Sequence, residues 1–143
     1  MIFTSEEELP NKTNKQQSIF LAGSMDTKLS NNWRIPVMDI YFEEYNFFDP
    51  TNRNYEKLNI LDMKLHIQWE LDALEMSDKI LLNLLPDALS PISLVELGLY
   101  VSSNKLIVVC PKEFYKSSYV HTLCEKYNTP IFNKINTALT QLC

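Results

Sequence analysis

One glutamate is distinguished by its surroundings. The stretch Pro91–Val101 contains Glu96 as its single charged residue, and most of its other side chains are apolar. Ser90 is a good N-cap and Pro91 suits the first helical position, so we expect a helix over 91–102 that is buried on almost all sides. A buried carboxylate is costly unless it faces a cleft, has a partner or is kept for function. Glu96 is therefore a candidate catalytic residue, and the alternative is a glutamate at a subunit edge or bonded to nearby backbone.

The chain has just two glycines, and their positions are informative. Gly23 ends an apolar run, where a turn after a strand often needs a positive φ or a close approach of another backbone. Gly98 lies two residues after Glu96 inside the expected helix, where glycine costs about 1 kcal/mol relative to alanine. We therefore expect another group to come close to the backbone at both glycines.

Further acidic residues precede this helix. Glu70, Asp72 and Glu75 lie in a segment with helical spacing over 66–76, and Asp78 comes just before an apolar run. Charged residues are usual on a solvated helix face, and an aspartate before a strand often caps a turn. Local pattern alone does not assign a function to any of the four.

The elements that must position these residues alternate along the chain. We expect strands over 18–22, 45–48, 79–85, 105–110 and 129–132, and helices over 31–44, 66–76, 91–102, 117–127 and 133–142. Strands that are apolar throughout and alternate with helices indicate a parallel sheet covered on both faces. We predict an α/β fold, a single-domain flavodoxin-like three-layer sandwich with about five parallel strands over 18–143, preceded by a mobile arm over 1–17. Ligands of such sheets bind at the carboxyl ends of the strands, where the strand order reverses.

Composition excludes several classes of partner. The 143 residues suit one domain, and a net charge of -5 without a basic stripe argues against polymeric nucleic acid, though not against a single nucleotide. No apolar run approaches the roughly 18 to 20 residues that span a bilayer, and the acidic start is unlike a signal peptide, so we expect no membrane partner and a cytoplasmic location. Cys110, Cys124 and Cys143 should be reduced thiols. His66 and His121 are far apart, so we expect no metal, and no cofactor is indicated.

Two segments resemble the nucleoside 2-deoxyribosyltransferase family, including its shorter nucleoside-deoxyribosyltransferase-like branch. The first is Ile19-Phe-Leu-Ala-Gly-Ser-Met25, and the second runs from Trp69-Glu-Leu-Asp-Ala-Leu-Glu-Met-Ser-Asp78 to Glu96-Leu-Gly-Leu-Tyr100. Asp49–Arg53 and Lys105–Phe114 are also similar to stretches of the shorter branch. Together the resemblance covers most of residues 18–132.

The resemblance implies cleavage of an N-glycosidic bond. Glu96 would attack the sugar C1′ to give a glycosyl-enzyme ester, which a second nucleobase or water would resolve. Glu70 would contact the leaving base and protonate it. The residues expected to bind the substrate, a nucleoside or nucleotide, are Phe20, Gly23, Ser24, Arg53, Ser90, Ser93 and Gly98. The serines suit a phosphate at a helix N-terminus, with Arg53 and Lys28 assisting, or they merely cap turns.

Two positions depart from the family's pattern. Phe20 stands where the transferases have a tyrosine that orients the nucleophile, and Ser90 replaces a base-contacting aspartate. Both changes argue against classical base exchange but leave the nucleophile in place. We favour an enzyme over a catalytically inactive nucleotide-binding or sensing module, and over a flavodoxin-like interaction domain. The resemblance also implies a homo-oligomer, a dimer or larger, with Tyr100 and the loop at 114–115 near the interface.

Overall fold

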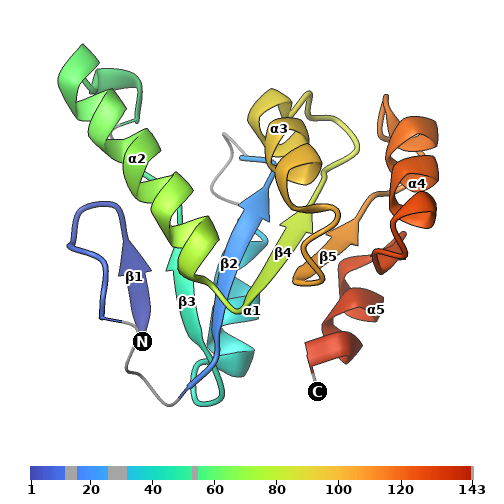
Figure 1. The fold of residues 1–143 in the computed structure, drawn as a ribbon, viewed down its shortest axis with the longest axis horizontal. Helices are drawn as coiled ribbons and strands as arrows, with labels where there is room; N and C mark the ends of the chain where they lie inside the picture. The colour runs from blue at the N-terminus through green and yellow to red at the C-terminus, as the bar shows by residue number, and fades with distance from the viewer. Residues whose placement is uncertain (12–15, 26–31, 53–54, 143) are drawn as a thin grey trace. The chain divides into compact units, whose positions relative to one another are not determined.

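The computed structural model describes residues 1–11, 16–25, 32–52 and 55–142 (Figure 1). Six parallel strands form one sheet in the order β1-β3-β2-β4-β5-β6. They are β1 (Ile2–Thr4), β2 (Ser18–Gly23), β3 (Asn46–Asp49), β4 (Lys79–Asn83), β5 (Leu106–Val109) and β6 (Ile131–Phe132). Without β1, this order is the 2-1-3-4-5 order of flavodoxin-like folds. The predicted fold class is thus confirmed, with six strands in place of about five.

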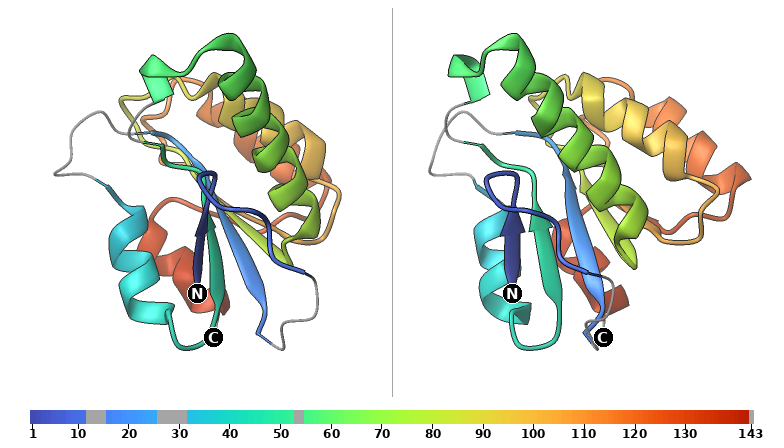
Figure 2. Two further views of the ribbon diagram at one scale, coloured as in Figure 1. Left: turned by 90° about the vertical axis from the view of Figure 1, so that its left-hand side faces the viewer. Right: turned by 60° about the vertical axis from the view of Figure 1, so that its left-hand side comes forward.

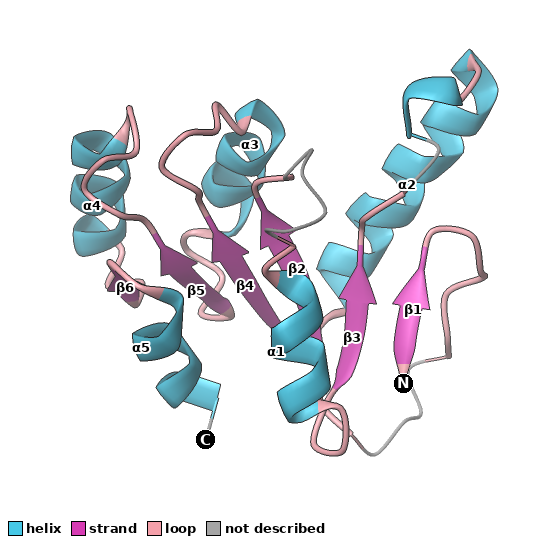
Figure 3. Ribbon diagram, turned by 180° about the vertical axis from the view of Figure 1, so that it is seen from behind, coloured by secondary structure: helices cyan, strands magenta, loops and turns pink. Residues whose placement is uncertain are grey.

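The chain divides into two compact units, and β2 contributes to both. The first unit comprises Met1–Leu21 and Trp33–Asp78, and therefore holds β1, β3, the start of β2, and the helices α1 (Arg34–Tyr41) and α2 (Ile60–Met76). In this unit α1 and α2 lie on opposite faces of the strands (Figures 1 and 3). Trp69 of α2 packs its ring against Phe20 and Phe48, with centroid separations of 6.4 and 6.3 Å. An aromatic cluster therefore fixes α2 onto the strands.

The second unit comprises Ala22–Asn32 and Lys79–Cys143. It holds β4, β5, β6 and the helices α3 (Pro91–Tyr100), α4 (Ser117–Lys126) and α5 (Ile135–Leu139), followed by the short turn η3 (Thr140–Leu142). Figure 2 shows α3 and α4 on one face of these strands and α5 on the other. Because helices cover both faces, the central residues of β4 and all residues of β5 are apolar, and Leu81, Leu82 and Val108 are fully buried.

Two elements differ most from expectation. Ile2–Thr4 forms β1, which pairs with β3 in the register Phe3↔Phe48, inside the segment where we expected a mobile arm. Helix α2 starts at Ile60, six residues before the predicted start at 66. Its N-cap is Asn59, whose side chain accepts a 2.8 Å hydrogen bond from the backbone N–H of Asp62. Strand β1 and the added first turns of α2 are each too short for a periodic pattern of apolar residues to predict them.

In the part of the chain that the structure describes, none of the helices combines the length and apolar character needed to cross a bilayer.

Candidate active site

The turn after β2 requires a glycine. Gly23 has φ +123°, and a Cβ atom there would lie 2.1 Å from the backbone oxygen of Asn83 in β4. The next N–H, that of Ser24, donates to the same oxygen at 2.9 Å. The expected close backbone approach at Gly23 is therefore confirmed, and it brings the carboxyl ends of β2 and β4 together in the second unit.

Two serine hydroxyls join three segments at this edge of the sheet. Ser24 is buried; its Oγ accepts a 2.8 Å hydrogen bond from the N–H of Leu85 and lies 2.5 Å from Ser90 Oγ. Ser90 occupies the N-cap position of α3, as predicted, but it has φ 51° and its side chain makes no capping bond. The expected cap is wrong because the hydroxyl is turned toward Ser24. The turn after β2, the loop after β4 and the start of α3 are thereby held together.

Helix α3 turns its polar residues inward. Ser93 and Glu96 are one turn apart on the same face and are 4% and 8% exposed. Ile92, Val95 and Leu99 on other faces are 57–59% exposed. The burial of Glu96 is confirmed, but the expectation of a helix buried on almost all sides is wrong. The face that packs against the rest of the unit is the one that carries the carboxylate.

Gly98 differs from Gly23. It is exposed, and a Cβ atom built there meets nothing within 4 Å among the described residues. The expectation that another group comes close to Gly98 is therefore not met in this part of the chain.

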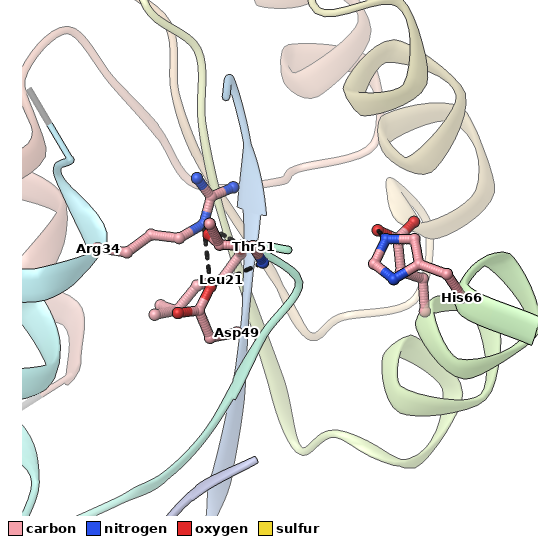
Figure 4. Close-up of polar contacts among 6 residues, drawn as sticks. Leu21, Arg34, Asp49, Thr51 and His66 are labelled. Atoms are coloured by element: carbon pink, nitrogen blue, oxygen red, sulfur yellow. Dashed lines mark hydrogen bonds and ion pairs between the residues drawn. The ribbon is translucent and has the colours of Figure 1, made fainter. Parts of the chain in front are cut away.

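A buried arginine organises the first unit (Figure 4). Arg34 is 2% exposed; its Nε donates to the backbone oxygen of Leu21 at 2.9 Å and lies 4.0 Å from Asp49 Oδ1. That oxygen also accepts from the N–H of Thr51 at 3.0 Å. Sequence reasoning missed this residue, although Arg34 shares the buried side of α1 with Val37, one turn further on. That periodicity is the signal that could have found it.

Glu70 forms a pair with a histidine that sequence reasoning had considered only as a metal ligand. His66 Nε2 lies 2.9 Å from Glu70 Oε1, one turn along α2, and the side chains are 4% and 17% exposed. Burial raises the pKa of Glu70, and the nearby His66 and Arg34 oppose this shift. Glu70 is thus a carboxyl group whose protonated form the fold favours, which is the property a general acid requires.

Several polar atoms of the first unit are buried without a hydrogen-bond partner among the described residues. They are His66 Nδ1, Trp69 Nε1, Thr51 Oγ1 and Ser5 Oγ. Buried polar atoms in folded proteins nearly always have a partner, which is protein or bound water. Two of these atoms belong to His66 and Trp69 of α2, and His66 is the partner of Glu70.

The remaining predicted residues fall in three groups. Phe20 is completely buried under Trp69 in the first unit. Arg53 and Lys28 lie outside the described residues. Gly23, Ser24 and Ser90 are brought together in the second unit, whereas Ser93 and Glu96 share one face of α3 and Glu70 belongs to the first unit.

Two other ionisable residues, Asp78 and Cys110, have contacts or burial that indicate a structural role. Asp78 Oδ2 accepts hydrogen bonds from the N–H and Oγ of Ser18, at 2.8 and 3.2 Å, which ties α2's exit to the start of β2. Cys110 is fully buried, and burial, with a smaller effect of Cys124, raises its pKa to about 12, so a thiolate there is disfavoured. The described residues include no cluster of His, Cys, Asp and Glu that could hold a metal ion.

A parallel α/β sheet with a glycine turn at the carboxyl ends of its strands is typical of proteins that bind a small ligand at that edge. The family model described as nucleoside 2-deoxyribosyltransferase like matches residues 16–114, more than half of the chain. The chain belongs to this family. The matched segment contains both Glu70 and Glu96, and the family suggests glycosyl transfer on nucleosides. No curated protein matches the chain.

Proposed function

We propose that this protein cleaves the N-glycosidic bond of a nucleoside, deoxynucleoside or nucleoside monophosphate through a covalent glycosyl-Glu96 intermediate. The observation that carries the proposal is the burial of Glu96, the one charged residue of α3, within the segment that the family model matches. A carboxylate held at 8% exposure is poorly hydrated, which suits a nucleophile toward a cationic, oxocarbenium-like carbon.

The two carboxyl groups have different tasks in this proposal. The Glu96 carboxylate forms a bond to C1′ as the C1′–N bond breaks, and the departing base takes a proton from Glu70. The raised pKa of Glu70 supports its assignment as the acid. Water or a second base then attacks C1′ and releases Glu96. Water would make the enzyme a hydrolase, and a base would make it a transferase.

The expected ligand contacts come from the edge formed by β2 and α3. Gly23 lets the turn after β2 lie against Asn83, Ser24 and Ser90 then meet through their hydroxyls, and Ser93 follows one turn into α3. These hydroxyls and the helix N-terminus support a preference for 5′-monophosphates over nucleosides. Self-association, expected from the family resemblance, is part of the proposal and can be measured by sedimentation velocity.

The test is release of free base from a panel of nucleosides and their 5′-monophosphates, followed by chromatography with and without an acceptor base. Glu96→Gln should lower the rate by about a thousandfold or more, since the amide keeps the shape but is a poor nucleophile. Glu125→Gln, an exposed glutamate of α4 in the same unit, is the matched control and should be fully active. Mass spectrometry of acid-quenched wild type should find the sugar attached to the peptide that contains Glu96.

Two results would contradict the proposal. Base release that survives in Glu96→Gln would exclude the covalent mechanism. Tight nucleotide binding without base release from any substrate would instead identify an inactive binding or sensing module.

A further inference from the structure

We propose that His66 is a positioning residue for Glu70, holding one carboxyl oxygen so that the other delivers the proton to the departing base. This inference rests on the proposed function and deepens it. His66 Nε2 lies 2.9 Å from Glu70 Oε1, and both side chains are largely removed from solvent. Because they are four residues apart on one helix, the contact depends on α2 alone.

The pair matches the charge changes of the reaction. When the C1′–N bond breaks, its electron pair passes to the base nitrogen, which takes the proton from Glu70. Glu70 is then a carboxylate, and a carboxylate can only accept hydrogen bonds. The N–H on His66 Nε2 supplies a donor for Oε1 at that moment, so Oε2 is the oxygen that carries the transferable proton. Attack by water or a second base, which loses a proton, returns a proton to Glu70.

The surroundings of the pair fix its geometry. The ring of Tyr55, in the turn η2 (Tyr55–Lys57), meets the imidazole edge-on at a centroid distance of 5.7 Å and an angle of 72°. Arg34 of α1 acts on Glu70 through its charge and is itself held by Leu21 and Asp49. Among the described residues of this unit, Tyr55 therefore meets the His66 ring and Arg34 acts on Glu70. Arg34 is anchored by these contacts and His66 is 4% exposed, so the donor to Oε1 is held in place before substrate binds.

The test compares two substrates that differ in their need for an acid. An ordinary purine nucleoside requires protonation of its base, whereas the base of an N7-methylated purine nucleoside departs neutral without taking up a proton. His66→Phe should slow cleavage of the ordinary substrate by roughly tenfold to a hundredfold, below the full contribution of a general acid. It should change cleavage of the methylated substrate by no more than about twofold. His66→Gln, which can donate to a carboxylate one turn along a helix, should recover part of the loss.

Equal losses on the two substrates would overturn the positioning role and leave His66 a merely structural residue. Urea unfolding of each variant shows whether the fold persists, and the substrate ratio remains interpretable even when some protein is lost.

A spectroscopic measurement separates this inference from the proposed function. The chain has two histidines, so ¹⁵N shifts of the imidazole nitrogens can be assigned with a His121 variant. We expect the neutral ring of His66 to carry its proton on Nε2 and its shifts to change in Glu70→Gln. A proton on Nδ1, or shifts indifferent to Glu70, would overturn the inference. If wild type cleaves neither substrate, the proposed function fails and the catalytic part of this role fails with it, while the shifts report whether the pair itself exists.

Discussion

Substituting the two glycines by alanine should have opposite effects on stability. At Gly23 the new methyl group would lie 2.1, 2.6 and 2.8 Å from backbone O, N and C atoms of Asn83. These are main-chain atoms of β4, so no side-chain rotation relieves the overlap, and the end of β2 must move away. At Gly98 the methyl group enters open space on a helix.

The magnitudes follow from this geometry. A non-glycine residue at φ +123° costs about 1–3 kcal/mol of backbone strain. Moving the strand end also disrupts the 2.9 Å bond from Ser24 N to Asn83 O, worth about 1 kcal/mol. Gly23→Ala should therefore lower the free energy of unfolding by about 2–4 kcal/mol. Gly98→Ala should raise it by about 0.5–1 kcal/mol, since alanine is the better helix former.

Urea unfolding followed by tryptophan fluorescence and circular dichroism measures both changes, provided that the slope of the transition stays constant. The reasoning would be refuted if Gly23→Ala unfolded within about 0.5 kcal/mol of wild type. It would also be refuted if the two variants were destabilised alike. Gly98→Ala should retain base release as well, and its loss would show that a ligand or partner approaches that glycine after all.

Three further outcomes are expected. Burial raises the pKa of Glu70 above its ordinary value of 4.5, so the folded chain favours the protonated form. Wild type should therefore lose stability relative to Glu70→Gln as pH rises from that value through the raised pKa. Thermal melts across this pH range measure the difference in stability, and a difference that stays constant with pH would refute the prediction. Burial raises the pKa of Cys110 to about 12 and that of Cys124 to about 11. In a Cys143→Ser variant, a thiol reagent at neutral pH should therefore modify neither cysteine until urea unfolds the protein. Modification of the folded protein on mixing would contradict this prediction. Asp78→Ala removes the acceptor for Ser18 and should cost about 1 kcal/mol in urea unfolding without altering which base is released, whereas a changed base preference would move Asp78 into the binding site.

The elements that sequence predicted well are those that combine a long apolar run with a clear boundary. The run after Ser18 and its end at Gly23, and the strand beginning at Lys79, are fixed by burial on both faces, which leaves an unbroken apolar pattern. The strand Ile2–Thr4 has three residues, and only its pairing with β3 makes it a strand. Pairing between segments so distant in sequence cannot be inferred from local composition.

Helix α2 shows a different limit. Its first residues, Ile60 and Leu61, are apolar yet 93% and 65% exposed, so their pattern contradicts the usual inside-outside rule. Asn59 followed three residues later by Asp62 was a usable N-cap signal, and it gives the correct start.

Some features of the candidate site could likewise be predicted from the sequence, and others could not. Burial of Glu96 followed from its apolar neighbours, and the need for glycine at position 23 followed from the strand end. The partner of Glu70 was visible as a histidine four residues earlier, but spacing alone does not distinguish a buried pair from a solvated one. The left-handed backbone at Ser90 could not be foreseen, because a serine before a proline normally indicates a conventional cap.

Helix α3 buries Ser93 and Glu96 and exposes several apolar side chains, and this arrangement affects how the helix responds to temperature. Ile92, Val95 and Leu99 are already hydrated in the folded chain, so among the apolar side chains of α3 it is mainly Leu97, 2% exposed, that detachment would hydrate. The heat-capacity change of that local opening should be smaller than that of opening β4 and β5, because heat capacity rises with newly hydrated apolar area and these strands are buried almost throughout. Hydrophobic stabilisation weakens on cooling, and β4 and β5 depend on it along almost their whole length. Amide hydrogen exchange should therefore find that α3, which carries Glu96, holds its position in the cold better than the strands beside it.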